Sequence, residues 1–535
     1  MPRAFLLVVT AVFCVLCVVP YAVAAGRTPA HENFSGLLLN AFDQNYYRAA
    51  QRSAAEALTQ ANRFTTEIEA PERVPHLYPL LGRVQRTTGA PSILVYHLPR
   101  VLAALVLPGL LFYLFALCFP GRPEPAMWAT LFALFTAGVL TFAPGLSFAI
   151  RSGERIPESS ILYSLSVFPH FAFSYVGLTL AFTALAKALR GHGVRSTAAV
   201  ALLAGVVLGI SHAFLVLPFA VVLFGFVSAQ LAPAIRHRTW PPRLVGLCAV
   251  ATIAVPAVPF VYGLHRVQRR LEELQGFTFP IAPSDSWWTW VLGFGLASVF
   301  AVAGSVWMVR RRARDPLTWM LLAWVAVQFF FVYAPFTVFQ RRFSEGLVVP
   351  VAGMAGAGAS LISGADGVGR ALRVGLVATF AVGAIAISRT LWALGDYVPE
   401  DVVGLWATID RSDVVLAGKE LSPQVPAHSD GTSFVARPLE TIHYQAKLDA
   451  AHRYAANPTS PESRSWLQSA GITTVVVMPD DGSFLPIDLD DPATCLRPVF
   501  RRPSLVAYRV QPECLRTAAD AAPGAGPGAA GGAGG

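Results

Sequence analysis

The sequence predicts a mainly α-helical fold: a polytopic transmembrane bundle of about eleven spans, followed by a small C-terminal α/β domain. Charged residues make up 14% of the 535 residues and hydrophobic residues 54%, whereas an ordinary soluble domain carries about 25% charge. The apolar residues gather in eleven stretches, each about long enough to cross a hydrocarbon core as a helix. Beyond residue 395 the composition becomes that of a soluble domain in which strand and helix patterns alternate.

The spans are expected to be helices because a backbone inside lipid must satisfy its own hydrogen bonds. The expected spans are residues 4–25, 99–119, 126–150, 161–186, 197–212, 214–232, 244–263, 287–309, 317–335, 346–363 and 373–394. Residues 196–235 contain no Lys, Arg, Asp or Glu, so one long span is the alternative to two short ones. For the first span the alternative is a cleaved signal peptide, since Ala22-Val23-Ala24 resembles a cleavage site.

Basic residues flank the spans and set the expected orientation. With the N-terminus inside, the inner loops hold 14 Lys and Arg residues and the three short outer loops hold 7. This positive-inside bias places residues 26–98 and 395–535 on the outer side of a bacterial cytoplasmic membrane. Contacts with anionic lipid therefore explain the net charge of +9, and no nucleic-acid partner is expected.

Both outer segments contain expected secondary structure. Residues 43–62 predict an amphipathic helix at the outer interface, with small residues repeating along one face, and residues 77–88 predict a second helix. The elements expected in the C-terminal region are helices at 400–410, 438–456 and 462–469, strands at 414–417 and 472–477, and a hairpin formed by 498–501 and 504–510.

The chain is accordingly divided into a membrane bundle (1–395, including the outer loop 26–98), an outer α/β domain (396–516) and a disordered Ala/Gly/Pro tail (517–535). Cys495 and Cys514 lie in the outer domain. An oxidising compartment permits a disulfide between them, and two free thiols are the alternative.

Two acids that follow the first span are candidate catalytic groups, Asp43 and Glu32. A carboxylate held near a membrane-embedded phosphate can take a proton from an incoming hydroxyl group, or bind a metal ion that activates it. Asp43 is the better placed, and Tyr46 and Tyr47 follow it. The alternative for Asp43 is a helix N-cap, a position at which Asp is among the preferred residues.

Polar residues in the short outer loops are candidate ligands for the substrate, because arginine is unexpected on the outer side. A guanidinium group suits a phosphate or diphosphate head group. The alternatives are snorkelling to lipid phosphates and, for Arg342, an ion pair with Glu345. The candidate substrate-binding residues of these loops are Gln340, Arg341, Arg342, Arg151 and Glu158.

Two histidines, His170 and His212, lie near the outer ends of otherwise apolar spans. Polar groups inside a membrane are costly and usually face the bundle interior or a cavity, so both are further candidates for substrate binding. The alternative is a structural histidine whose hydrogen bonds are satisfied. The sequence carries no Walker-type phosphate loop, no His-Glu-x-x-His and no zinc-spaced cysteines, so nucleotide hydrolysis and metalloprotease chemistry have no support.

This layout resembles the GT-C superfamily of integral-membrane glycosyltransferases, which combine a helical bundle, a large first outer loop with interfacial helices and often an outer C-terminal domain. Short segments of the sequence also resemble pieces of bacterial members. These are Asn62-Arg63-Phe64-Thr65-Thr66-Glu67, Pro169-His170-Phe171, Gln340-Arg341-Arg342-Phe343, and Leu439-Glu440-Thr441 with Lys447.

The resemblance implies that an acid of the first outer loop acts as the base, and Asp43 is the position that matches it. It also implies a polyprenyl-phosphate sugar donor, the lipid bilayer as surroundings, and a glycan, lipid or protein acceptor. Members often carry two adjacent acids or an acid-x-acid triplet, whereas Gln44 and Asn45 follow Asp43 here. No cofactor is certain, and a divalent cation, Mg²⁺ or Mn²⁺, is the candidate.

The leading hypothesis is a membrane glycosyltransferase that moves a hexosyl or pentosyl group from the lipid-linked donor to an acceptor at the outer face. A transporter or flippase is the first alternative, and such proteins keep ionisable or broken-helix sites near the bilayer midplane. A non-catalytic envelope scaffold is the second. A cavity that contains both Asp43 and Arg341 would favour the enzyme.

Overall fold

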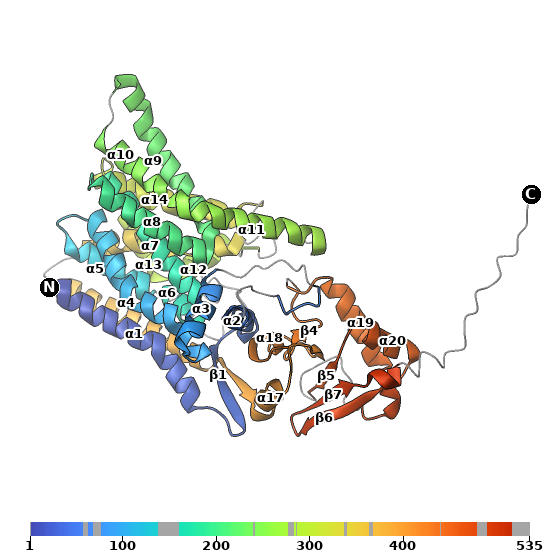
Figure 1. Cartoon of the computed structure of the whole chain (residues 1–535). Coiled ribbons are helices and arrows are strands. Elements are labelled where there is room, and N and C mark those ends of the chain that lie inside the picture. Colours follow the sequence, from blue (N-terminus) through green and yellow to red (C-terminus); the bar gives the residue numbers. More distant parts are fainter. Residues whose placement is uncertain are drawn as a thin grey trace, which may run out of the picture.

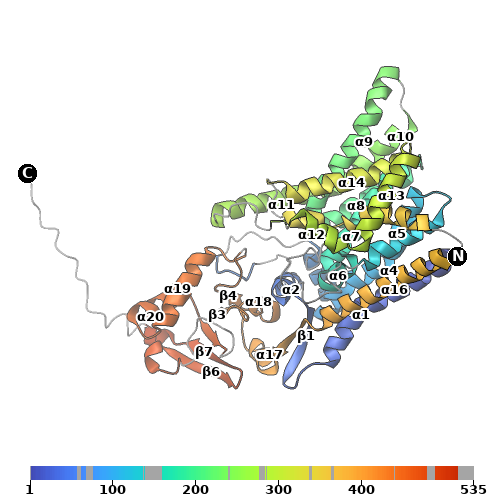
Figure 2. The ribbon, with the colours of Figure 1, turned by 180° about the vertical axis from the view of Figure 1, so that it is seen from behind.

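The structure, a computed structural model, consists of a helical bundle with a smaller α/β part at one end (Figure 1). In the view from behind, α1 and α16 run side by side along the bundle (Figure 2). The structure describes residues 2–56, 62–67, 76–136, 138, 160–238, 241–275, 283–284, 286–335, 340–362, 367–438, 440–478 and 489–515.

Eight helical stretches in this part of the chain are long and apolar enough to cross a membrane, or nine if a bent pair is one span. This confirms a helical, multi-pass membrane bundle. The single helices are α1 (Pro2–Gly26), α4 (Ser92–Cys118), α7 (Pro169–Leu189), α14 (Pro316–Tyr333) and α16 (Gly367–Trp392). The composite stretches are α8 (Val194–His212) with α9 (Val216–His237), α10 (Pro242–Val250) with α11 (Ala254–Gln275), and η7 (Gln340–Ser344) with α15 (Val348–Ala359). The bent pair is α12 (Trp287–Phe294) and α13 (Leu296–Arg312), which meet at 98°.

The count of eight or nine falls short of the expected eleven, for two reasons. First, α5 (Pro123–Phe135) covers only the start of the expected span 126–150, and residues 139–159 lie outside the described chain. The buried helix α6 (Ile161–Val167) then leads into α7. Second, α8 and α9 follow each other without a non-helical gap, so residues 194–237 are counted as one stretch.

Packing contacts show that α8 and α9 nevertheless run in opposite directions. Gly246 of α10 packs against Ala188, at the end of α7 from which α8 starts. Gly209, near the end of α8, packs against Phe260 of α11. The chain has therefore returned to the starting end of α8 when α10 begins, so α9 must cross back, as the two-span interpretation of this region expected.

Glycines bring α13 and α15 together backbone to backbone. A Cβ atom at Gly304 would overlap the main chain of Met354, and a Cβ atom at Gly358 would overlap that of Phe300. Such small-residue contacts hold helices together in lipid, where apolar surface alone gives no preference for protein over lipid tails. They fix α15, and with it the arginine-bearing segment η7 that precedes it.

The first outer segment and the C-terminal region meet at one end of the bundle. β1 (Glu32–Leu38) pairs antiparallel with β2 (Gly395–Pro399), so the expected domain boundary at residue 396 falls inside a strand. The helix expected at 77–88 is confirmed as α3 (Leu77–Thr88). The helix expected at 43–62 is α2 (Ala41–Glu56), beyond which the described chain resumes at residue 62.

The C-terminal region forms a small α/β domain with a five-stranded sheet in the order β4-β3-β5-β7-β6. β3 is parallel to β4 and β5, and β7 is antiparallel to β5 and β6. The strands are β3 (Val414–Ala417), β4 (Thr432–Ser433), β5 (Thr474–Val477), β6 (Leu496–Arg502) and β7 (Leu505–Val510). The helices are α17 (Glu400–Trp406), α18 (Val425–His428), α19 (Tyr444–Ala456) and α20 (Pro461–Ser469).

The expected hairpin is confirmed as β6–β7. Of the two alternatives for Cys495 and Cys514, the structure shows the disulfide. The tail at 517–535 lies outside the described residues.

Candidate functional site

Asp43 lies in the first turn of α2, and the N-cap of this helix is another residue. The side chain of Asn40 accepts a hydrogen bond from the backbone N–H of Asp43 (3.3 Å) and donates one to its carboxylate (2.5 Å). Leu39 and Asn40 both have positive φ, 47° and 54°, which forms the tight turn between β1 and α2. The N-cap interpretation of Asp43 is therefore wrong, and the carboxylate is available for other contacts.

The main contact of Asp43 is with Arg437, a residue of the C-terminal domain. Nη2 of Arg437 lies 2.5 Å from Oδ1 of Asp43, and Nε lies 3.1 Å from Oε2 of Glu440. The guanidinium also stacks over the rings of Phe42 and Tyr46 at 4.9 and 4.8 Å. Burial alone would lower the pKa of Arg437, but Glu440 and Asp43 raise it above its usual value. The pair is thus a fixed ionic contact between α2 and the C-terminal domain.

Tyr47, one turn after Asp43 on α2, links the acid to the membrane helices. Its ring stacks on Tyr78 of α3 at 4.5 Å and lies 4.6 Å from the ring of His170 at the start of α7. The hydroxyl of Tyr78 is 2.7 Å from Nδ1 of His170. Burial raises the pKa of Tyr47, which also senses the charges of Arg342, Asp43 and Arg437. Tyr47 therefore lies between the acid and the outer arginine loop.

His170 continues this chain of buried polar groups to His212 and Glu345. The two imidazole rings are 4.6 Å apart, edge to face, and Nδ1 of His212 bonds to the Glu345 carboxylate. Gln328 of α14 donates to the backbone carbonyl of Glu345. Nε2 of each histidine is buried without a hydrogen bond to any described residue. The structure thus brings both predicted histidines into one buried network, in which two ring nitrogen atoms have no hydrogen bond to a described residue.

The predicted arginines lie on η7, directly before Glu345. Arg342 interacts electrostatically with Tyr47, His170 and His212, so it belongs to the same cluster. Nε of Arg341 is buried without a hydrogen bond among the described residues.

Gln340 has a different position, because its side chain donates to the backbone of Ala334 (2.9 Å) and accepts from that of Ser284 (3.4 Å). It holds the ends of two loops together.

Three predicted residues are not placed in this cluster. Glu32 begins β1, opposite Pro399, at the end of the strand remote from α2. Arg151 and Glu158 lie outside the described residues.

Sequence reasoning missed Arg437 as a site residue and assigned Glu345 only as a partner for Arg342. The local sequence offered a weak signal for each, since both lie within six residues of segments that resemble GT-C members.

Two of those segments contact each other. Thr441 donates to the carbonyl of Phe64 (2.6 Å), and Asn62 donates to the carbonyl of Glu440 (3.0 Å). Nζ of Lys447 lies 2.8 Å from the carboxylate of Glu67. Residues 62–67 are thus fastened to the C-terminal domain, and the ring of Phe64 contacts Tyr46 on α2 at 5.3 Å.

The described residues do not form a ready metal site. No group of three His, Cys, Asp or Glu side chains among them is arranged to hold an ion. The carboxylate of Asp43 is held by Arg437 and Asn40, and the two positions directly after Asp43 carry no second acid. The donor set described here therefore does not fit Mg²⁺ or Mn²⁺.

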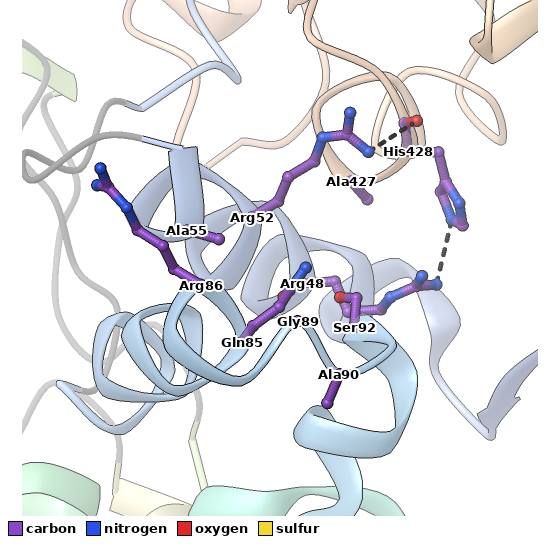
Figure 3. A pocket seen from close by; sticks show the side chains of 10 residues that line it. All are labelled: Arg48, Arg52, Ala55, Gln85, Arg86, Gly89, Ala90, Ser92, Ala427 and His428. Carbon is purple, nitrogen blue, oxygen red and sulfur yellow. Dashed lines mark hydrogen bonds between the residues drawn. The ribbon is translucent and has the colours of Figure 1, made fainter.

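Two cavities lined by described residues lie elsewhere. A cavity of about 490 Å³ is bounded by α2, α3, α4 and α18 (Figure 3), and one of about 580 Å³ lies at the carboxyl end of β3 beside α19. Neither is lined by Asp43 or Arg341. The cavity expected to hold both residues is thus not among these two.

No protein-family model and no curated protein matches the sequence. Solved structures do resemble the chain. The oligosaccharyltransferase AglB of Archaeoglobus fulgidus, in complex with an inhibitory peptide and a dolichol-phosphate, has a TM-score of 0.54 at 11% identity, over 89% of this chain and 70% of its own. ArnT of Cupriavidus metallidurans, bound to undecaprenyl phosphate, has 0.53 at 15% identity, over 94% and 98%. The mycobacterial arabinofuranosyltransferase AftD has 0.56 at 15% identity, over 96% of this chain and 40% of its own.

These likenesses show that the chain has the fold of the GT-C glycosyltransferases. At 11–15% identity they show the fold alone.

Proposed function

We propose that the protein is a glycosyltransferase that moves a sugar from a polyprenyl-phosphate donor to an acceptor at the outer face of the cytoplasmic membrane. The observation that carries the proposal is the cluster around Tyr47. It joins the carboxylate-bearing turn of α2, the His170–His212 pair and Arg342 at one end of a GT-C-like bundle.

In this reaction a carboxylate oxygen of Asp43 takes the proton from the acceptor hydroxyl group. The acceptor oxygen then forms a bond to the anomeric carbon, whose bond to the phosphate oxygen breaks. The polyprenyl phosphate leaves with that electron pair and gains negative charge. Arg341 and Arg342 stabilise this charge, because guanidinium groups form charge-assisted hydrogen bonds to phosphate.

The remaining groups orient the reactants. Arg437 and Asn40 hold Asp43 in one rotamer, which keeps the base fixed relative to Tyr47. The open Nε2 atoms of His170 and His212 are placed to hydrogen-bond a sugar hydroxyl or a phosphate oxygen. No step in this scheme uses a metal ion.

The structural neighbours support the class of substrate. AglB was solved with dolichol-phosphate and ArnT with undecaprenyl phosphate, which are both polyprenyl phosphates. The positive-inside bias supports an outer location for Asp43 and the C-terminal domain. The β1–β2 pairing and the Asp43–Arg437 contact are consistent with one shared compartment.

Incubation of the purified protein with a panel of polyprenyl-phosphate sugars tests the proposal by the release of polyprenyl phosphate. Asp43→Asn should lower the rate by about 100-fold or more, the usual contribution of a general base. Glu32→Gln shows which of the two candidate acids is the base. Asp490→Asn is the matched control, because Asp490 forms an exposed ion pair with Arg501 and should not affect the rate. Full activity of the Asp43→Asn protein would show that Asp43 is not the base. Movement of the intact lipid-linked sugar across a vesicle membrane, without release of polyprenyl phosphate, would favour a transporter over an enzyme.

A further inference from the structure

Among the walls of the 490 Å³ cavity are Arg48 and Arg52 of α2 (Figure 3), which face away from the side of this helix that carries Asp43. Arg52 follows Asp43 by nine positions, which corresponds to half a turn of rotation around the helix axis. The cavity is bounded by the bundle on one side, through α3 and the start of α4, and by α18 of the C-terminal domain on the other. It therefore occupies the interface between the two parts of the molecule.

The walls of the cavity carry an excess of positive charge. Arg48, Arg52 and Arg86 line it, and none of the described residues in its walls is acidic. Arg52 forms an ion pair with Asp430 (2.8 Å) and donates to the carbonyl of His428 (3.2 Å). Burial, with the charges of Arg48 and Arg52, lowers the pKa of His428 well below its usual value, so His428 adds an uncharged ring. Asp430 therefore balances only part of this charge.

Several hydrogen-bond donors around the cavity are left for a ligand. Nε of Arg48 is buried and has no hydrogen bond to a described residue, while its Nη1 lies 3.3 Å from Nε2 of His428. Arg86, on the other rim, extends away from α18 (Figure 3), and no hydrogen bond or ion pair joins its side chain to another described residue. Gln85 accepts a hydrogen bond from Gln51 through Oε1 (3.0 Å), which leaves its amide N–H groups for another acceptor.

The start of α4 adds a further attraction for an anion. Ser92 lines the cavity and is the first residue of this 27-residue helix. The free N–H groups and the positive dipole end of a helix N-terminus favour phosphate. Together with the guanidinium groups, they form a site of positive charge and donors.

Exposed apolar residues next to the cavity indicate its level relative to lipid. Leu80 and Val84 of α3 and Leu94 and Leu98 of α4 are exposed, with Leu94 at 64%. Large apolar side chains on a membrane protein are exposed where lipid covers them. The arginine-lined cavity therefore adjoins an exposed apolar surface of the kind that lipid covers.

We propose that this cavity binds a phosphoryl group, as a phosphate ester held at the membrane surface, at a site separate from the Asp43 cluster. A ligand there would contact α2, α3 and α4 of the bundle together with α18. It would strengthen the interface that places Arg437 against Asp43. The ester is either that of a lipid head group or that of a soluble phosphate ester.

Binding is tested on the full chain in nanodiscs, without any transferase assay. The two probes are phosphatidic acid, mixed into phosphatidylcholine nanodiscs and counted by native mass spectrometry, and glycerol 3-phosphate, added in solution and followed by calorimetry. The variant is Arg86→Gln, and the matched control is Arg83→Gln, an exposed arginine of α3 that does not line the cavity. Arg52→Gln combined with Arg86→Gln is the stronger variant.

Wild type and Arg83→Gln should bind one of the probes, and Arg86→Gln should bind it about tenfold to a hundredfold more weakly, as expected for the loss of one charge-assisted hydrogen bond. Retention of phosphatidic acid alone identifies a lipid source, and binding of glycerol 3-phosphate with the same dependence on Arg86 identifies a soluble one. The proposal is overturned if neither probe binds, or if Arg83→Gln weakens binding as much as Arg86→Gln. If the double variant does not fold, Arg86→Gln alone decides.

Discussion

The carboxylate of Asp43 and the guanidinium of Arg437 meet at 2.5 Å across 394 residues of sequence. One belongs to the first outer segment and the other to the C-terminal domain. The orientation of the proposed base therefore depends on how that domain packs against the bundle. This dependence can be tested separately from the chemistry itself.

Arg437→Gln should lower kcat by about 100-fold with little change in KM, because a misplaced base slows the reaction without removing a substrate contact. Arg437→Lys keeps the charge and should recover part of the rate. Steady-state kinetics with a lipid-linked sugar measure both. Arg453→Gln, at an exposed position of α19 in the same domain, serves as the control. A rise in KM alone would show that Arg437 binds substrate and does not position Asp43.

Arg342→Gln should lower kcat by about 100-fold, since it removes a group that stabilises charge on the departing phosphate. Arg310→Gln, an exposed arginine in the last turn of α13, is the matched control and should keep its rate. Release of polyprenyl phosphate under saturating donor is the measurement. Wild-type release by the Arg342 variant would place the leaving group elsewhere.

His212→Ala should reduce the free energy of unfolding by about 3–5 kcal/mol, because it removes the imidazole that bonds to the buried Glu345 carboxylate. Glu345→Gln keeps a hydrogen-bonding group and should cost less, about 1–3 kcal/mol. Denaturant titration in detergent measures both values. His192→Ala, at an exposed position between α7 and α8, should have little effect. Equal stability of the two histidine variants would contradict the network.

Glu67 should make stability depend on pH. Burial alone would raise the pKa of Glu67, but hydrogen bonds from Lys447 and Thr65 lower it below its usual value of 4.5. A carboxyl group whose pKa is lower in the folded state stabilises the protein fully above the unfolded pKa, and this contribution disappears as the pH falls through the folded pKa.

Glu67→Gln should therefore lower Tm at pH 7, and the difference from wild type should shrink as the pH falls below about 4.5. Thermal unfolding at a series of pH values measures this. Glu462→Gln on α20 is the control. A difference that stays constant with pH would show that the Glu67 carboxylate does not stabilise the fold through its charge.

Much of the fold follows from local sequence patterns. The helix at 77–88 and the strand at 414–417 were predicted with the observed bounds, because periodicity and flanking residues are local signals. The sequence also contained a local signal for the N-cap of α2, because Asn40 stands three positions before Asp43, which is the spacing of a capping box. The N-cap role that the sequence analysis gave as the alternative for Asp43 belongs to Asn40.

The site depended on long-range contacts that no local pattern contains. β1 and β2 each need the other as a partner, and neither strand was predicted. Arg437 gained its role from Asp43, and Glu345 from His212, which lies 133 residues earlier. Residue type indicated which groups were costly to bury, as for both histidines, but the pairing of those groups follows only from tertiary structure.

The pairing of β1 with β2 also has a consequence for biogenesis. β2 follows the last described membrane helix, so the ribosome has made every helix of the bundle before this strand exists. Until then β1 has an unpaired edge, and the turn that carries the acid lacks the backbone bond from Leu39 to Leu394. A nascent chain halted before residue 395 would thus lack the strand and the backbone bond that hold the turn of Asp43, so this turn reaches its final structure only after the described membrane helices have been made.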